Sequence, residues 1–137
     1  MPLLGFHKRF ANAVECGDKL QTIRAIRKRP FKVGDRLFLY TGCRTSHCRR
    51  LGEGMVERVR DIRIEREPTS HLHVSVGAWS AARLRTLRRC ELVKLARDDG
   101  FPDIYEFYRW FVDGINGQII NWKRLPRAKW KRPPWVT

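Results

Sequence analysis

The stretch GMVERVRDIRIE, residues 54–65, predicts one long strand with an interruption. Val56 and Val59 are out of phase with each other, whereas Ile62 and Ile64 are in phase. Alternation with a period of two is typical of a strand that buries one face, and a break in it indicates a bulge or bend. Such bends are common where sheets curl. The stretch therefore predicts a small curved sheet, closed as a β-barrel.

Other strands are expected on both sides of this stretch. They cover residues 21–25, RLFLYTG at 36–42, HLHVSV at 71–76 and GQIINWKRL at 117–125. In HLHVSV the apolar residues alternate cleanly, which places His71 and His73 on the opposite face. We expect these histidines to be solvent-facing neighbours within the sheet and not metal ligands.

Three helices are expected around the sheet. Apolar residues recur at helical spacing between Phe6 and Val14, and Gly17 follows where a left-handed residue ends a helix of about ten residues. Residues 87–98 favour helix by propensity. A further helix has Pro102 in its first turn, ends at Gly114 and buries an aromatic stripe in the core. This order predicts an α+β fold, a small curved β-barrel with flanking helices.

The composition indicates a polyanionic partner. The 137 residues carry 29 Lys and Arg against 14 Asp and Glu, a formal charge of +15. Such a surface attracts polyanions, so we expect RNA or a nucleotide as the partner and leave DNA open. No segment approaches the ~20 apolar residues of a transmembrane span, and MPLLGFHKRF is not a signal peptide. We therefore expect no membrane association and a cytoplasmic location, and make no prediction of the oligomeric state.

The four cysteines do not indicate a disulfide framework. Cys43 and Cys48 lie in GCRTSHCRR together with His47, a set of ligands that zinc accepts. Their spacing matches no standard zinc motif, and a fourth ligand would have to come from far away in the sequence. We prefer reduced cysteines over a structural zinc site, and predict neither a metal nor a cofactor.

The stretch GDKLQTIR, residues 17–24, is a polar run at the expected helix-to-strand junction. Alternation along the strand puts Thr22 and Arg24 on one face, with Lys19 just before them. Two cations and a hydroxyl suit a phosphate or the polar edge of a base. They also suit catalysis. A hydroxyl beside a lysine of lowered pKa is an activated nucleophile, provided that a carboxylate is available to transfer protons. A third interpretation, cations on a solvated edge, fits the spacing equally well.

Four segments resemble the ASCH domain, a branch of the PUA-like superfamily. They are AVECGDKLQTIR, FKVGDRLFLYTGCRT, ARDDGFPDIYEFYRWF and GQIINWKRL, in the order expected for that family. The resemblance covers roughly residues 5–125, so we expect an ASCH-like domain over residues 1–125 and a basic, Trp-containing tail over 126–137. In the family a G-x-K-T-x-T-x-R segment lines a cleft at the mouth of the barrel. Lys19 and Thr22 match that segment, and Leu20 stands where threonine is common.

The resemblance implies a protein that binds RNA, holds a nucleotide or base in this cleft, and processes RNA in some relatives. The residues assigned to nucleic-acid or nucleotide binding are Lys19, Gln21, Thr22, Arg24, Arg27, Lys28, Arg44, Thr45, Lys129 and Trp130. The alternative is a hydrolase, either an N4-acetylcytidine amidohydrolase or a ribonuclease. Its catalytic residues are Lys19, Thr22 and Asp99, with Asp99 in place of a family glutamate. Trp130 and Trp135 either stack on bases or pack back on the barrel.

Overall fold

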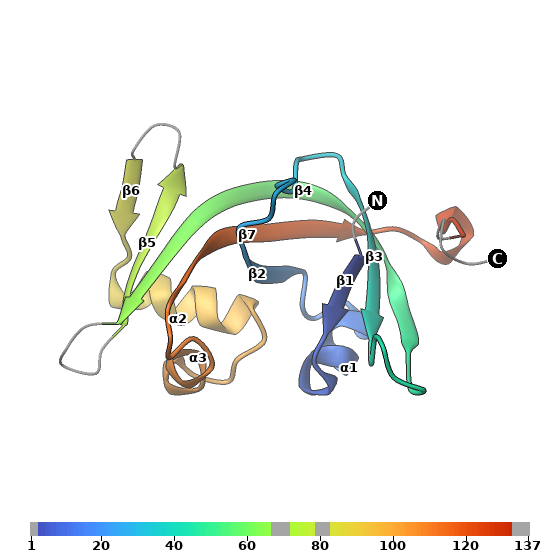
Figure 1. The fold of residues 1–137 in the computed structure, drawn as a ribbon, viewed down its shortest axis with the longest axis horizontal. Helices are drawn as coiled ribbons and strands as arrows, with labels where there is room; N and C mark the ends of the chain where they lie inside the picture. Colours follow the sequence, from blue (N-terminus) through green and yellow to red (C-terminus); the bar gives the residue numbers. More distant parts are fainter. Residues whose placement is uncertain (1–2, 67–71, 79–82, 133–137) are drawn as a thin grey trace.

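The computed structural model describes residues 3–66, 72–78 and 83–132 of the chain. Within these residues, seven strands form one curved sheet and three α-helices pack against it (Figure 1). The strands are β1 (Leu3–Phe6), β2 (Gln21–Ala25), β3 (Arg36–Thr41), β4 (Arg49–Arg66), β5 (Leu72–Ala78), β6 (Arg83–Thr86) and β7 (Ile115–Arg124). The helices are α1 (Lys8–Cys16), α2 (Arg89–Asp98), α3 (Ile104–Trp110) and a single 3-10 turn, η2 (Arg127–Lys129).

The strand β4 is eighteen residues long and organises the sheet. It pairs with β3 through residues 49–55, with β7 through residues 54–64 and with β5 through residues 61–66, in each case antiparallel. Its register with β7 shifts between Val56 and Arg58. The bulge expected from the broken alternation is confirmed, and the long bent strand carries the curvature seen in Figure 1.

The sheet is curved but does not close, so the expectation of a barrel is wrong. β1 runs parallel to β3 at one edge, and β2 runs antiparallel to β7 at another. Among the described strands, β1 and β2 do not pair with each other. Instead, Arg24 of β2 donates from Nη2 to the carbonyl oxygen of Gly5 in β1 at 2.7 Å. A side chain therefore bridges the gap that backbone hydrogen bonds span in a closed barrel.

Apolar side chains cover both faces of the sheet. Ile119 and Ile120 are neighbours in β7 and both are fully buried. Because successive strand residues point to opposite faces, each face has its own packed layer. α1 lies against β1, β3 and β4, and Figure 1 shows α2 and α3 together at the other end of the sheet. The coarse prediction, an α+β fold with helices flanking a curved sheet, is confirmed.

The predicted helices form with small shifts at their ends. Gly17 ends α1 with φ 89°, the left-handed conformation expected there. Phe6, assigned from its spacing to the helix, belongs to β1 instead. Pro102 precedes α3, which Asp103 caps by accepting from the backbone N–H of Glu106 at 2.9 Å. The short edge strands β1 and β6 were not predicted, because four residues at a sheet edge leave little periodic signal.

The histidine and cysteine predictions have simple outcomes. A ring nitrogen of His73 lies 2.9 Å from the hydroxyl of Thr86 on the neighbouring strand, as expected for a sheet neighbour. His71 lies outside the described residues. All four cysteines are free thiols, and within the described ranges no three His, Cys, Asp or Glu side chains gather in a way that could hold a metal ion.

The described part of the tail, residues 126–132, packs on the sheet through the buried carboxylate of Glu53. That carboxylate pairs with Arg36 at 2.7 Å and with Arg50, and it accepts from the backbone N–H of Lys131 at 2.8 Å. The indole of Trp130 lies over the Arg50 guanidinium at 4.8 Å and donates from Nε1 to the carbonyl oxygen of Leu125 at 2.9 Å. Trp130 therefore packs against the sheet, while Trp135 lies outside the described residues.

None of the helices in the described ranges has the length and the apolar composition that a membrane crossing requires.

We predict that Glu53→Gln lowers the free energy of unfolding by about 3 kcal/mol, because it removes a buried anion that pairs with two partly buried arginines. Urea denaturation followed by circular dichroism measures the change. The matched control is Glu15→Gln: Glu15 also pairs with an arginine, Arg49, but both side chains are nearly half exposed. The control should change stability by less than about 1 kcal/mol. Equal losses in the two variants would contradict a structural role for Glu53.

Candidate functional site

A buried lysine marks the site. Lys19 precedes β2 and is only 2% exposed, although lysines are rarely buried. Its backbone N–H donates to the carbonyl oxygen of Ala13 at 2.9 Å, which folds the chain back over α1 after the turn at Gly17. The ammonium Nζ then lies 4.9 Å from the centre of the Phe10 ring and 5.9 Å from that of Phe6. The aromatic rings face the cation with their electron-rich surfaces.

Asp99 is the counterion of this lysine. It is the residue that ends α2, and it is 4% exposed. Nζ of Lys19 donates to the backbone oxygen of Asp99 and lies 3.5 Å from its carboxylate Oδ1. The next residue, Gly100, has φ +98°, and a Cβ there would lie 3.2 Å from Cδ of Lys19. The glycine therefore allows both the turn after α2 and the close approach of the lysine.

Burial favours the neutral forms of both side chains, so it lowers the pKa of Lys19 and raises the pKa of Asp99. The pKa of Lys19 falls to about 8, mainly because of desolvation, with the charge of Asp99 opposing the shift and that of Arg24 adding to it. The pKa of Asp99 rises to about 6, again mainly because of desolvation, with Lys19 opposing. At pH 7 the pair is therefore mostly charged, and on the order of a tenth of Lys19 is neutral.

Thr22 and Arg24 lie beside this pair, as the alternation along β2 predicted. The Arg24 guanidinium donates from Nε to the hydroxyl oxygen of Thr22 at 3.0 Å and lies 4.9 Å from the centre of the Phe6 ring. Burial lowers the pKa of Arg24 below its ordinary value, with Asp99 opposing. Since the Thr22 oxygen accepts from Arg24, its own hydroxyl proton remains available to a ligand.

These four side chains line one small cavity, which we call the Lys19 cavity. It has a volume of about 140 Å³, and its other walls include His7, Trp110 and Phe111. A dry cavity of about 150 Å³ in another protein holds one benzene molecule, so this one has room for a single six-membered ring. The lining combines cations and a hydroxyl with aromatic rings, a combination that suits a flat ring with a polar edge.

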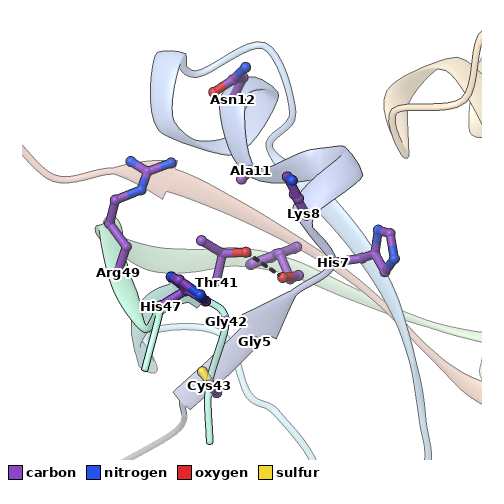
Figure 2. A pocket seen from close by; sticks show the side chains of 11 residues that line it. Gly5, His7, Lys8, Ala11, Asn12, Thr41, Gly42, Cys43, His47 and Arg49 are labelled. Atoms are coloured by element: carbon purple, nitrogen blue, oxygen red, sulfur yellow. Dashed lines mark hydrogen bonds between the residues drawn. The ribbon is translucent and has the colours of Figure 1, made fainter. Parts of the chain in front are cut away.

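A larger cavity adjoins the first and shares Gly5, Phe6 and His7 with it. We call it the outer cavity; its volume is about 920 Å³, near the upper end of the range for ligand pockets. Figure 2 shows His7, which precedes α1, and Lys8 and Asn12 of that helix on one side, and side chains from β3, β4 and the turn between them on the other. The latter are Thr41, Cys43, His47 and Arg49.

The other residues predicted to bind do not reach the Lys19 cavity. Gln21 does not line this cavity, although its Nε2 lies 3.4 Å from Oδ1 of Asp99, which does. Arg27 and Lys28 are exposed in the loop after β2, with the Arg27 guanidinium 4.5 Å from the centre of the Phe31 ring. The remaining four lie in two further segments. Arg44 and Thr45 occupy the turn that borders the outer cavity, and Lys129 and Trp130 lie in the tail.

Sequence reasoning missed the aromatic walls of the site. Phe6, Phe10 and His7 reach it because α1 packs on β1 and Arg24 of β2 donates to Gly5 of β1, a tertiary arrangement with no local signal. Trp110 is different, since it is 45% exposed and lies off the buried stripe of α3. A large aromatic residue outside the apolar stripe of a helix was a signal that could have identified it.

A comparison of the chain with protein-family models, with curated proteins and with solved structures found no match.

We predict that Asp99→Asn lowers the pKa of Lys19 below its value of about 8, because the carboxylate that favours the charged ammonium is removed. Titration of the Lys19 side chain by carbon-detected NMR measures it. Asp98→Asn is the matched control, since Asp98 is the preceding residue but pairs with Lys94 at 2.7 Å. An unchanged Lys19 titration in Asp99→Asn would contradict the pairing described above.

Proposed function

We propose that the protein binds RNA or a nucleotide in the manner of an ASCH domain, and that the Lys19 cavity holds one base. The observation that carries the proposal is the cavity itself, which is the size of one ring and has cations and a hydroxyl at one edge and aromatic rings around it. The same residues match the family segment noted in the sequence.

The donors of the cavity fit a base with neighbouring acceptors. The ammonium group of Lys19 has three N–H donors, and its contacts with Asp99 use some of them. The remaining capacity, together with the hydroxyl proton of Thr22, can bind a carbonyl oxygen and a ring nitrogen. Cytosine has both acceptors on one edge, in O2 and N3, and fits a space for one six-membered ring, whereas N3 of uracil carries a hydrogen and donates. Stacking on an aromatic side chain adds about 1–3 kcal/mol per base.

The surroundings of the cavity fit the rest of a nucleotide chain. The outer cavity has the volume for a sugar and a phosphate, and Lys8 and His47 on its walls can bind an oxyanion. The formal charge of +15 supplies long-range attraction for a polyanion. Exposed cations in the loop after β2 and in the turn after β3, namely Arg27, Lys28 and Arg44, are candidates for backbone contacts. Lys129, which is exposed in the tail, is a further candidate for a backbone contact, whereas Trp130 packs against the sheet and Gln21 contacts Asp99.

We predict that Thr22→Val weakens binding of a short single-stranded RNA about fivefold to tenfold, because a buried hydrogen-bonding group is lost. Lys19→Met should weaken it at least as much. Fluorescence anisotropy at fixed salt measures both, and thermal melting verifies that each variant is folded. Affinity should also fall steeply between low and moderate salt, because each neutralised phosphate releases counterions.

The control for this experiment is Lys123→Met, since Lys123 is an exposed lysine on β7 that lies outside both cavities. It should change RNA affinity less than twofold. RNA binding that is equally strong in the wild type, Thr22→Val and Lys19→Met would contradict a base in the Lys19 cavity.

A second candidate function, hydrolysis of an N4-acylated cytidine or of RNA, is favoured by one observation: Asp99 reaches Lys19. A neutral Lys19 can take the proton of the Thr22 hydroxyl as the oxygen attacks an acyl carbon. The lysine then returns that proton to the departing amine, and water cleaves the acyl ester that remains on Thr22. Asp99 keeps the ammonium stabilised between these steps.

We predict that, if the protein hydrolyses N4-acetylcytidine, kcat/KM rises with pH through about 8, because the neutral form of Lys19 is the base. Lys19→Ala and Thr22→Ala should abolish turnover, which liquid chromatography of the product measures. Turnover that survives both substitutions would exclude this site. A wild-type protein that binds RNA but converts neither N4-acetylcytidine nor labelled RNA would leave binding as the function.

A further inference from the structure

A second polar cavity lies on the opposite face of β2 and shares no lining residue with the Lys19 cavity. Its volume is about 570 Å³. It lies between β4 and β7 on one side and α2 with β5 and β6 on the other, at the end of the sheet where Figure 1 shows α2. We call it the arginine cavity, because its polar walls include Arg58, Arg60, Arg85, Lys94, Gln21 and Asn121.

The charges in the arginine cavity do not balance. Of the groups that line it, four are cations, and Glu91 and Asp98 are the only two acids. Both acids are taken: Arg85 contacts the two oxygens of Glu91 at 2.8 and 2.6 Å, and Lys94 pairs with Asp98 at 2.7 Å. Among the described residues, Arg58 and Arg60 form no ion pair. Two positive charges therefore face the cavity without a carboxylate partner.

The position of Arg60 within β4 is unusual. Ile62 and Ile64 alternate on one face of β4 and are fully buried. The same alternation places Arg60, and then Arg58, on that face, and Arg60 lies directly opposite the buried Ile119 of β7. A strand position that continues a core stripe would normally carry an apolar side chain. Arg60, which is half-buried, thus occupies a site where packing alone favours another residue, whereas Arg58 is exposed.

Arg60 also has an unused donor. Its Nη2 donates to the amide oxygen of Asn121 at 3.4 Å, but its Nε is buried and has no hydrogen-bond partner in the described part of the chain. Burial and the neighbouring charge of Arg58 lower the pKa of Arg60 below its ordinary value, with Asp98 opposing. A buried donor without an acceptor and two adjacent like charges are both unfavourable, and one anion would relieve both.

We propose that the arginine cavity binds a phosphate group, whose oxygens the guanidiniums of Arg58 and Arg60 hold. A guanidinium presents paired donors in a plane, which match the oxygens of a phosphate better than an ammonium does. The phosphate belongs either to a polynucleotide backbone or to a free nucleotide. This inference goes beyond the proposed function, because it does not depend on a base in the Lys19 cavity.

The experiment titrates the full-length protein with inorganic phosphate and pyrophosphate and records the arginine Nε–H signals by NMR. Saturable shifts of the Arg60 and Arg58 signals are expected, with the Arg60 Nε–H gaining a hydrogen bond. This measurement needs no substitution, so a folding defect cannot obscure it. The absence of saturable shifts at either arginine would overturn the proposal.

Variants test the same site by calorimetry. Arg58→Gln and Arg60→Gln should each weaken pyrophosphate binding at least fivefold, and Arg60→Gln should not lower the melting temperature, since it removes an unpaired cation. The control is Arg89→Gln, an exposed arginine on α2 outside the cavity. Pyrophosphate binding that is unchanged in both cavity variants, or reduced equally by Arg89→Gln, would overturn the proposal.

Two further titrations identify the source of the phosphate and distinguish binding in the arginine cavity from binding in the Lys19 cavity. If a short RNA competes with pyrophosphate and a nucleoside monophosphate does not, the ligand is a polynucleotide backbone; the reverse result identifies a free nucleotide. A nucleoside without phosphate reports on the Lys19 cavity alone. Phosphate binding without nucleoside binding would contradict a base in the Lys19 cavity and support a phosphate in the arginine cavity. Nucleoside binding without phosphate binding would support the base site and overturn the phosphate site.

Discussion

The rest of the structure depends on the three-way pairing of β4. One strand joins β3, β7 and β5, and β1, β2 and β6 pair with these three, so every other described strand is held by β4 directly or through a single neighbour. If β4 were straight, the strands and helices that pack at its two ends would lie far apart. The bulge at Val56–Arg58 instead bends the strand, which lets α1 pack at one end and α2 and α3 at the other while the chain between them remains close.

The buried pair of Lys19 and Asp99 joins these two ends. Lys19 follows α1 and Asp99 ends α2, so the ion pair connects segments that are eighty residues apart. Gln21 extends the connection, because its Nε2 contacts Asp99 and its Oε1 accepts from Asn121 at 3.3 Å. Asn121 in turn accepts from Arg60. A continuous set of polar contacts thus runs from one face of β2 to the other.

Much of the fold was predictable from local patterns. The broken alternation around Val59 gave the bulge of β4, and Gly17 gave the end of α1, because each feature depends on residues close together in the sequence. Closure of the sheet was not predictable, since it depends on whether β1 and β2 meet, and β1 is only four residues long.

The candidate site divides in the same way. Alternation along β2 was enough to bring Thr22 and Arg24 together, and the family resemblance supplied Asp99. Burial of Lys19 between Phe6 and Phe10 required the packing of three elements. The arginine cavity escaped notice because Arg58 and Arg60 look like ordinary surface cations in a chain with 29 Lys and Arg.

The side chains of Arg36, Glu53 and Arg50 form a clamp on the tail, and the way in which they bind it determines which substitutions the tail tolerates. Each polar contact that the clamp makes with residues 129–131 involves the tail backbone: the N–H of Lys131 and the carbonyl oxygens of Lys129 and Lys131. The lysine side chains take no part in these contacts. Their charges can therefore be lost or reversed without moving the tail, whereas a proline at position 131 would remove the amide hydrogen that Glu53 binds.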